Sequence, residues 1–235
     1  MITSKDYDDR IIAQGLKHQI DNFYEPKDLF EQRRIDIVME ALDPKPEEKI
    51  LDVGCGVGTF AFHCAKLGAK TFGIDYSTES IRVANELCTR FGVSHNTTFA
   101  VGDATTLPYE NEYFDKIVAA DFIEHIGLSE KEALVKEMYR VLKPEGRAVV
   151  FTPNGMREKI GTFYWKIRNI LFHHKIPTTE LHYGLTHRHE FEKICTKYNF
   201  KFKLRYVDKT RPYLAKIPVL RNVLALNLLW IMRKA

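Results

Sequence analysis

The sequence has few of the features that mark a secreted, disulfide-stabilised or metal-binding protein. Its cysteines are Cys55, Cys64, Cys88 and Cys195. Their spacing matches neither a disulfide framework nor a metal site, so reduced thiols in the cytoplasm are the simplest interpretation. Residues 1–10 are polar and acidic, unlike a secretory signal peptide. We therefore expect a cytoplasmic protein.

Long apolar runs, repeats and low-complexity segments are also missing. The longest apolar stretch near the C-terminus is interrupted by Lys216, Arg221 and Asn227, so no segment can span a bilayer. The net charge of +4 is too small to indicate nucleic-acid binding by itself. Basic residues nevertheless concentrate after residue 156, and residues 103–132 are acidic on balance. A chain of 235 residues fits one α/β domain with an elaboration, or at most two small domains.

What the sequence does contain is a glycine-rich turn in residues 49–59, KILDVGCGVGT. The apolar residues before the glycines predict a short buried strand, and residues 60–67 predict a helix directly after them. Gly54, Gly56 and Gly58 alternate, which allows a sharp turn and lets a ligand approach a backbone that has no Cβ atoms. This context of strand, turn and helix is the one in which such glycines bind nucleotides.

A second predicted strand, residues 70–74, is followed by Asp75, which lies 17 residues beyond Gly58. An acidic residue about 20 residues after such a turn reaches the ribose hydroxyls in dinucleotide-binding folds. The turn and this carboxylate together predict half of a nucleoside-binding site. The alternative is a tight turn between strand and helix without a ligand, and the position of Asp75 argues against it.

Asp52, directly before the glycines, indicates which nucleoside is bound. Nicotinamide and flavin cofactors place a pyrophosphate on the helix N-terminus, and a neighbouring carboxylate would repel it. A carboxylate suits a ligand with a cationic amino group, such as the methionine part of S-adenosylmethionine. An NAD-dependent oxidoreductase and a nucleoside-binding module without catalysis are the alternatives.

The run D-V-G-C-G-V-G, residues 52–58, resembles the first motif of the class I S-adenosylmethionine-dependent methyltransferases. The run R-V-L-K-P-E-G-R, residues 140–147, resembles the family's link into strand five, and the resemblance covers about residues 48–153. It implies an α/β, Rossmann-like, doubly wound and mostly parallel seven-stranded sheet of order 3-2-1-4-5-7-6, with the last strand antiparallel. It also implies a helical cap or lid in residues 1–47, a methyltransferase domain in residues 48–235, and an insert at about 154–186.

Acidic residues follow each of the first four predicted strands: Asp52, Asp75, Asp103 and Asp121. Because ligands bind beyond the carboxyl ends of parallel strands, we expect these carboxylates to surround one site. Within the resemblance, Asp103 binds the adenine amino group, although a plain loop residue would also fit. The cofactor-binding set that the resemblance implies is Arg34, Asp52, Gly54, Cys55, Gly56, Gly58, Asp75, Tyr76, Asp103, Ala104 and Ala120.

Two members of this set have open alternatives. Arg34 falls near the cofactor-contacting arginine of ubiquinone-pathway O-methyltransferases, but a solvated helix face that includes Arg33 is equally compatible with the sequence. Tyr76 either covers the adenosine or belongs to the core.

The chemistry is expected at Asp121, Glu124 and His125, after strand four. Methyl transfer needs an acceptor held in line and, for a hydroxyl, a base that removes its proton. His125 could be that base, since its unperturbed pKa is ~6.5. The triplet resembles the E-x-x-E-H segment of ubiquinone-biosynthesis O-methyltransferases, which is linked to a divalent cation. Mg²⁺ would suit oxygen ligands, but Glu-His pairs are widespread in the superfamily without metal, so we predict no metal site.

The acceptor is predicted only by class. The segments 160–176 and 211–224 combine aromatic or aliphatic residues with Lys and Arg, which suits either an anionic membrane surface or a cover over a hydrophobic substrate. His182, His187 and His189 are expected to be solvated or to line the acceptor site. We predict transfer of a methyl group to a small molecule, with O-methylation of a phenolic, quinone-precursor, lipid or glycan hydroxyl favoured. A nucleic-acid methyltransferase is disfavoured because no N-P-P-Y-type segment follows strand four.

Secondary-structure boundaries complete the expectations. The helix after strand four is predicted to begin after a Ser129 cap and to end at Leu142. Strands five, six and seven are predicted at residues 147–152, 201–207 and 224–232. The oligomeric state is not predicted.

Overall fold

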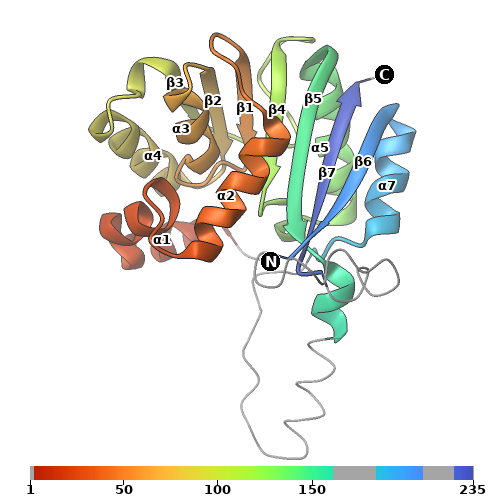
Figure 1. Ribbon diagram of the computed structural model, residues 1–235, viewed down its shortest axis with the longest axis horizontal. Coiled ribbons are helices and arrows are strands. Elements are labelled where there is room, and N and C mark those ends of the chain that lie inside the picture. The colour runs from red at the N-terminus through yellow and green to blue at the C-terminus, as the bar shows by residue number, and fades with distance from the viewer. Residues whose placement is uncertain (1–2, 161–183, 209–224, 235) are drawn as a thin grey trace, which may run out of the picture.

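The computed structural model describes residues 3–160, 184–208 and 225–234. Seven strands form one sheet of order β3-β2-β1-β4-β5-β7-β6 (Figure 1). Strand β7 is antiparallel to both β5 and β6, and the pairs among the first five strands are parallel. This is the predicted fold class, strand order included. The strands are β1 Lys49–Val53, β2 Lys70–Asp75, β3 Thr97–Val101, β4 Phe114–Ala120, β5 Leu142–Pro153, β6 Phe200–Val207 and β7 Asn227–Lys234.

Helices cover both faces of the sheet because the central strands bury residues on both sides. Side chains of odd-numbered positions in β1, such as Leu51 and Val53, pack with α5 and α7 in one apolar cluster. Ile50 packs on the other face with α2 and α3. The helices are α1 Ser4–Gln19, α2 Leu29–Leu42, α3 Thr59–Lys66, α4 Thr78–Arg90, α5 Leu128–Val141 and α7 Arg188–Lys197.

The N-terminal segment lies over one end of the sheet (Figure 1). Helix α1 continues into a short π-helix, η1 Ile20–Tyr24. The Tyr24 hydroxyl donates a 2.6 Å hydrogen bond to the carbonyl of Val57 in the glycine turn. Asp8 accepts hydrogen bonds from the Ser77 hydroxyl at 2.6 Å and from the Glu79 amide at 3.0 Å, which ties α1 to the N-terminus of α4. Most of the insert predicted at 154–186 lies outside the described residues, and the domain division at residue 47 stays a prediction.

Three predicted boundaries were wrong. Gly127, not Ser129, caps α5, because the Glu130 carboxylate accepts a 2.6 Å hydrogen bond from the Gly127 amide and so starts the helix earlier. Strand β5 begins at Leu142, which already pairs with Phe114 before the chain bulges and resumes pairing at residue 147. Strand β7 begins at Asn227 rather than at residue 224.

Candidate functional site

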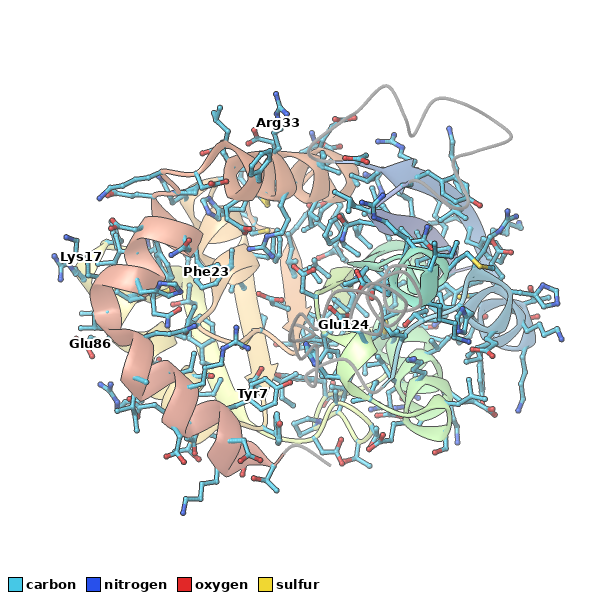
Figure 2. All side chains as sticks on the ribbon, turned by 90° about the horizontal axis from the view of Figure 1, so that it is seen from below. Tyr7, Lys17, Phe23, Arg33, Glu86 and Glu124 are labelled. Atoms are coloured by element: carbon cyan, nitrogen blue, oxygen red, sulfur yellow. The ribbon has the colours of Figure 1, made fainter. Side chains whose placement is uncertain are left out.

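A cavity of about 760 Å³ lies at the carboxyl ends of the parallel strands, beside the N-terminal helical segment. Figure 2 looks onto this end of the molecule and shows Tyr7, Phe23 and Glu124 around the strand ends. The predicted site residues that line the cavity are Arg34, Asp52, Gly54, Cys55, Gly56, Asp75, Tyr76, Asp103, Ala104, Ala120, Asp121, Glu124 and His125. The four strand-end carboxylates therefore meet in one place.

Gly58 is the predicted residue that does not line the cavity. It starts α3 with a left-handed φ of 83°, and a Cβ atom there would lie 2.9 Å from the Phe99 ring. A glycine is needed at this position because the Phe99 ring packs against it, and no ligand contact has to be invoked.

The other two glycines of the turn differ from each other in the space that a Cβ atom would have. A Cβ atom on Gly54 would lie 2.3 Å from the Phe122 ring, so this glycine lets Phe122 pack against the turn. At Gly56, which has a φ of 51°, a Cβ atom would meet nothing within 4 Å. Among the three, only Gly56 has open space where a Cβ atom would lie, and it also lines the cavity.

Asp75 is held by backbone amides at the end of β2. Its Oδ2 accepts a 2.9 Å hydrogen bond from the Gly56 amide, and its Oδ1 accepts one of 2.9 Å from the Ser77 amide. Burial nevertheless raises the pKa of Asp75 above its ordinary value, because desolvation of the carboxylate outweighs the amides. Each carboxylate oxygen keeps capacity to accept one further hydrogen bond from a hydroxyl group.

Asp52 occupies the position that a phosphate would need. It is 2% exposed, and its Oδ2 accepts a 3.0 Å hydrogen bond from the Ala61 amide in the first turn of α3. Burial raises the pKa of Asp52 to about 7, and the charge of Asp75 adds to this effect. Because a carboxylate already lies against an amide of the first turn of α3, this helix N-terminus is a poor site for a pyrophosphate.

Arg34 is buried, which resolves the alternative of a solvated helix face, whereas Arg33 lies at the outer surface of α2 (Figure 2). The Arg34 Nη1 donates a 2.5 Å hydrogen bond to Oδ2 of Asp121, and its Nε donates one of 2.9 Å to Glu31. The guanidinium stacks near the Phe23 ring, 5.7 Å from its centroid. Asp121 has a left-handed φ of 52°.

Several buried polar atoms have no hydrogen-bond partner within the protein. Among the described residues there are five such side-chain atoms, and three belong to residues that line the cavity: Gln19 Oε1, Arg34 Nη2 and Asn227 Oδ1. Leaving a buried polar atom unsatisfied costs about 1–3 kcal/mol. The concentration of such atoms around one cavity indicates that it accepts a polar ligand.

Glu124 and His125 lie beyond β4. Glu124 is 1% exposed, and its Oε2 accepts a 2.8 Å hydrogen bond from the Thr152 hydroxyl. Burial and the nearby charge of Asp121 raise the pKa of Glu124 to about 8. The His125 ring meets the Tyr7 ring edge-on at 5.8 Å, and Tyr7 meets Tyr76 edge-on at 5.4 Å. Tyr76 is 40% exposed and lines the cavity, so it is no core residue.

Sequence reasoning missed the residues that come from distant elements. Tyr7, Gln19 and Phe23 reach the cavity from the N-terminal segment, and Asn227 reaches it from the start of β7. No local pattern marks them, since each is defined by its contact with a strand end far away in the sequence.

The positions of Asp103 and of the three histidines give less support to the roles predicted for them. The Asp103 Oδ1 accepts 2.8 Å hydrogen bonds from the amide and the hydroxyl of Thr105, as a loop residue would, and the residue also lines the cavity. His187 and His189 are not among the cavity-lining residues, and His182 lies outside the described residues. Within the described part of the chain, no group of three or more His, Cys, Asp or Glu side chains could hold a metal ion.

Comparison with known proteins agrees with this geometry. Residues 50–146 match the family model described as a methyltransferase domain. Norajmaline N-methyltransferase from Rauvolfia serpentina is 37% identical over 112 residues, which are 47% of this chain and 38% of that protein. Tocopherol O-methyltransferase from Arabidopsis thaliana is 34% identical over 116 residues, 49% of this chain and 33% of that protein. The chain thus spans less than half the length of these relatives.

Solved structures show the same fold. Geranyl diphosphate C-methyltransferase from Streptomyces coelicolor A3(2) superposes with a TM-score of 0.66 at 17% identity, over 87% of this chain and 79% of that one. The chain therefore contains a methyltransferase domain of the class I S-adenosylmethionine-dependent type, as the sequence predicted. S-adenosylmethionine is the cofactor of this family. None of the helices in the described residues is long and apolar enough to cross a bilayer.

Proposed function

We propose that this protein transfers a methyl group from S-adenosylmethionine to a small-molecule acceptor. The observation that carries the proposal is the single cavity in which Asp52, Asp75 and the unpartnered Arg34 Nη2 meet the open backbone of Gly56. Curated relatives of the matched segment include both N- and O-methyltransferases.

The residues present fit this cofactor. Arg34 Nη2 would donate to the carboxylate of its methionine part, and Asp52 and Gln19 would accept from the amino group. Asp75 would accept from the ribose hydroxyls, and Asp103 with Ala104 would receive the adenine. When bound, S-adenosylmethionine supplies a methyl group that is already activated by a sulfonium charge.

The chain's own residues have little covalent chemistry to perform and act mainly by position. Arg34 fixes Asp121 at the end of β4, next to the Glu124 carboxyl and the His125 ring. We assign His125 as the base that takes the acceptor's proton, with the Tyr7 ring holding the imidazole edge-on. A hydroxyl acceptor, on a phenolic, quinone-precursor, lipid or glycan molecule, is the one that needs this base.

Titration calorimetry with S-adenosylmethionine and S-adenosylhomocysteine tests the proposal. Both should bind in the micromolar range, while NAD should not bind, because the Asp52 carboxylate against the first turn of α3 would repel its pyrophosphate. Absence of binding for both adenosyl ligands would remove the proposal. Binding without turnover on a broad acceptor panel would favour the alternative of a non-catalytic module.

A further inference from the structure

Asn227 is a buried polar residue whose place is set by the antiparallel strand. It is the first residue of β7 and pairs with Pro153 at the end of β5. Because β7 runs opposite to β5, its start lies at the same edge of the sheet as the ends of the parallel strands. Asn227 is 7% exposed and lines the cavity, and its Oδ1 has no hydrogen-bond partner among the residues that the structure describes.

Neighbouring donors are engaged elsewhere. The Thr152 hydroxyl donates to Glu124, and the Asn154 Nδ2 donates a 3.0 Å hydrogen bond to the carbonyl of Ala225. Pro153, the partner of Asn227 across the strands, has no amide hydrogen. Among the described residues no donor reaches the Asn227 oxygen, and a ligand in the cavity that Asn227 lines could supply one.

Glu124 also lines the cavity, and it follows β4 on the other side of β5 from β7. Its carboxyl is fixed by Thr152, the residue next to Pro153 in the chain. Glu124 and Asn227 are thus tied to consecutive positions at the end of β5. The proposed function gives the cofactor the ends of β1, β2 and β3 together with Arg34 and Gln19 of the N-terminal segment, and it leaves Asn227 at the start of β7 for the acceptor.

We propose that Asn227 selects the methyl acceptor by accepting a hydrogen bond from one of its O–H or N–H groups. The inference rests on the proposed function and deepens it. A site with a buried acceptor atom discriminates strongly against molecules that lack the matching donor, because binding them leaves the oxygen unpaired. Acceptors that present only apolar or alkylated groups to this end of the cavity are rejected.

The test compares phenol with anisole and aniline with N,N-dimethylaniline, as probes that differ in the donor. Binding to the S-adenosylhomocysteine complex is followed by calorimetry and by NMR of the protein with ¹⁵N-labelled asparagine side chains. Asn227→Leu should weaken phenol and aniline by about five- to tenfold and leave the two alkylated probes within about twofold. Asn227→Asp, which retains an acceptor oxygen, should keep most of the phenol affinity.

Asn154→Leu is the matched control, since Asn154 is buried at the same edge with its amide group hydrogen-bonded. It should lower the unfolding temperature, whereas Asn227→Leu should leave that temperature unchanged or raise it and should keep S-adenosylhomocysteine affinity within about twofold. A lowered unfolding temperature for Asn227→Leu, equal loss of all four probes, or wild-type protein that binds neither donor probe would overturn the inference. Wild-type protein that fails to bind S-adenosylhomocysteine would instead overturn the proposed function.

Discussion

The two parts of the sheet differ in how strongly their sequences resemble known proteins. Residues 50–146, which supply β1 to β4 and the strand-end carboxylates, match the methyltransferase family model, and the match ends before most of β5. Charge changes at the same place: residues 1–146 contain 17 Lys and Arg against 26 Asp and Glu, and residues 147–235 contain 18 against 5. The matched part thus carries the four strand-end carboxylates, and the excess of basic residues begins where the match ends.

The parts also differ in how their site residues are held. In the cofactor part, Asp52 and Asp75 accept from backbone amides within one βαβ unit. In the second part, Asn227 is placed by the pairing of β7 with β5, and Thr152 donates a hydrogen bond back to Glu124 of the first part. Changes in the first part should therefore affect cofactor binding, and changes in the second should affect the acceptor.

The largest effect is expected from Arg34→Met. It removes the buried cation that pairs with Asp121 and Glu31, and the loss of both ion pairs should lower the free energy of unfolding by about 3 kcal/mol. S-adenosylhomocysteine affinity should fall by at least about tenfold, as a lost charged hydrogen bond implies. Chemical denaturation and calorimetry measure both quantities. Arg33→Met, at an exposed position, should change stability by less than about 0.5 kcal/mol, and equal effects at both positions would contradict the assignment.

Two substitutions in the glycine turn should separate an effect on stability from an effect on cofactor binding. Gly54→Ala places a methyl group on the Phe122 ring and should cost about 2–3 kcal/mol of stability. Gly56→Ala meets no neighbour and should cost only about 1 kcal/mol, from its left-handed backbone. Gly56→Ala should weaken S-adenosylhomocysteine binding more than Gly54→Ala does when each loss of affinity is divided by the loss of stability in the same variant. The prediction fails if Gly56→Ala binds this ligand as tightly as wild type.

The pH dependence of stability tests the buried acids. An acid whose pKa is higher in the folded state binds more protons when folded, so stability falls as pH rises from the unfolded pKa to the folded one. For Glu124 this window runs from 4.5 to about 8, and for Asp52 from 3.8 to about 7. Glu124→Gln should therefore gain stability over wild type by roughly 1–3 kcal/mol at pH 8.5, with a smaller gain at pH 5. Urea denaturation at both pH values measures the difference in stability between Glu124→Gln and wild type. A difference that is the same at pH 5 and pH 8.5 would argue against a buried protonated Glu124.

The smallest effect is expected at the contact between α1 and α4. Asp8→Ala removes a carboxylate that accepts from Ser77 and from the Glu79 amide, and the loss of such a cap costs about 1 kcal/mol. Cofactor affinity should fall only a few-fold, because α1 supplies Tyr7 and Gln19 to the cavity. Asp9→Ala, at an exposed position of the same helix, serves as the control. Identical unfolding curves for the two variants would show that the Asp8 contact does not stabilise the N-terminal segment.

Much of the fold could be predicted because the relevant signals are local. Apolar runs such as residues 114–120 and the glycine turn define the strands of the cofactor part, and acids at four strand ends do meet in one cavity. The roles assigned to those residues stay predictions. The cap at Gly127 was missed because it depends on the side chain of Glu130 rather than on the residue type at the cap.

The resemblance of the sequence to a known family implied the strand order, and the acids at the ends of the predicted strands indicated the set of carboxylates around the cavity. Only the tertiary structure decided that Gly58 supports packing while Gly56 faces the cavity, and that Arg34 is buried while Arg33 is not. It alone brought Tyr7 against His125 and placed Asn227 beside Pro153. The last two contacts join residues more than 70 positions apart in the chain, and no local pattern of residues encodes which distant groups will meet.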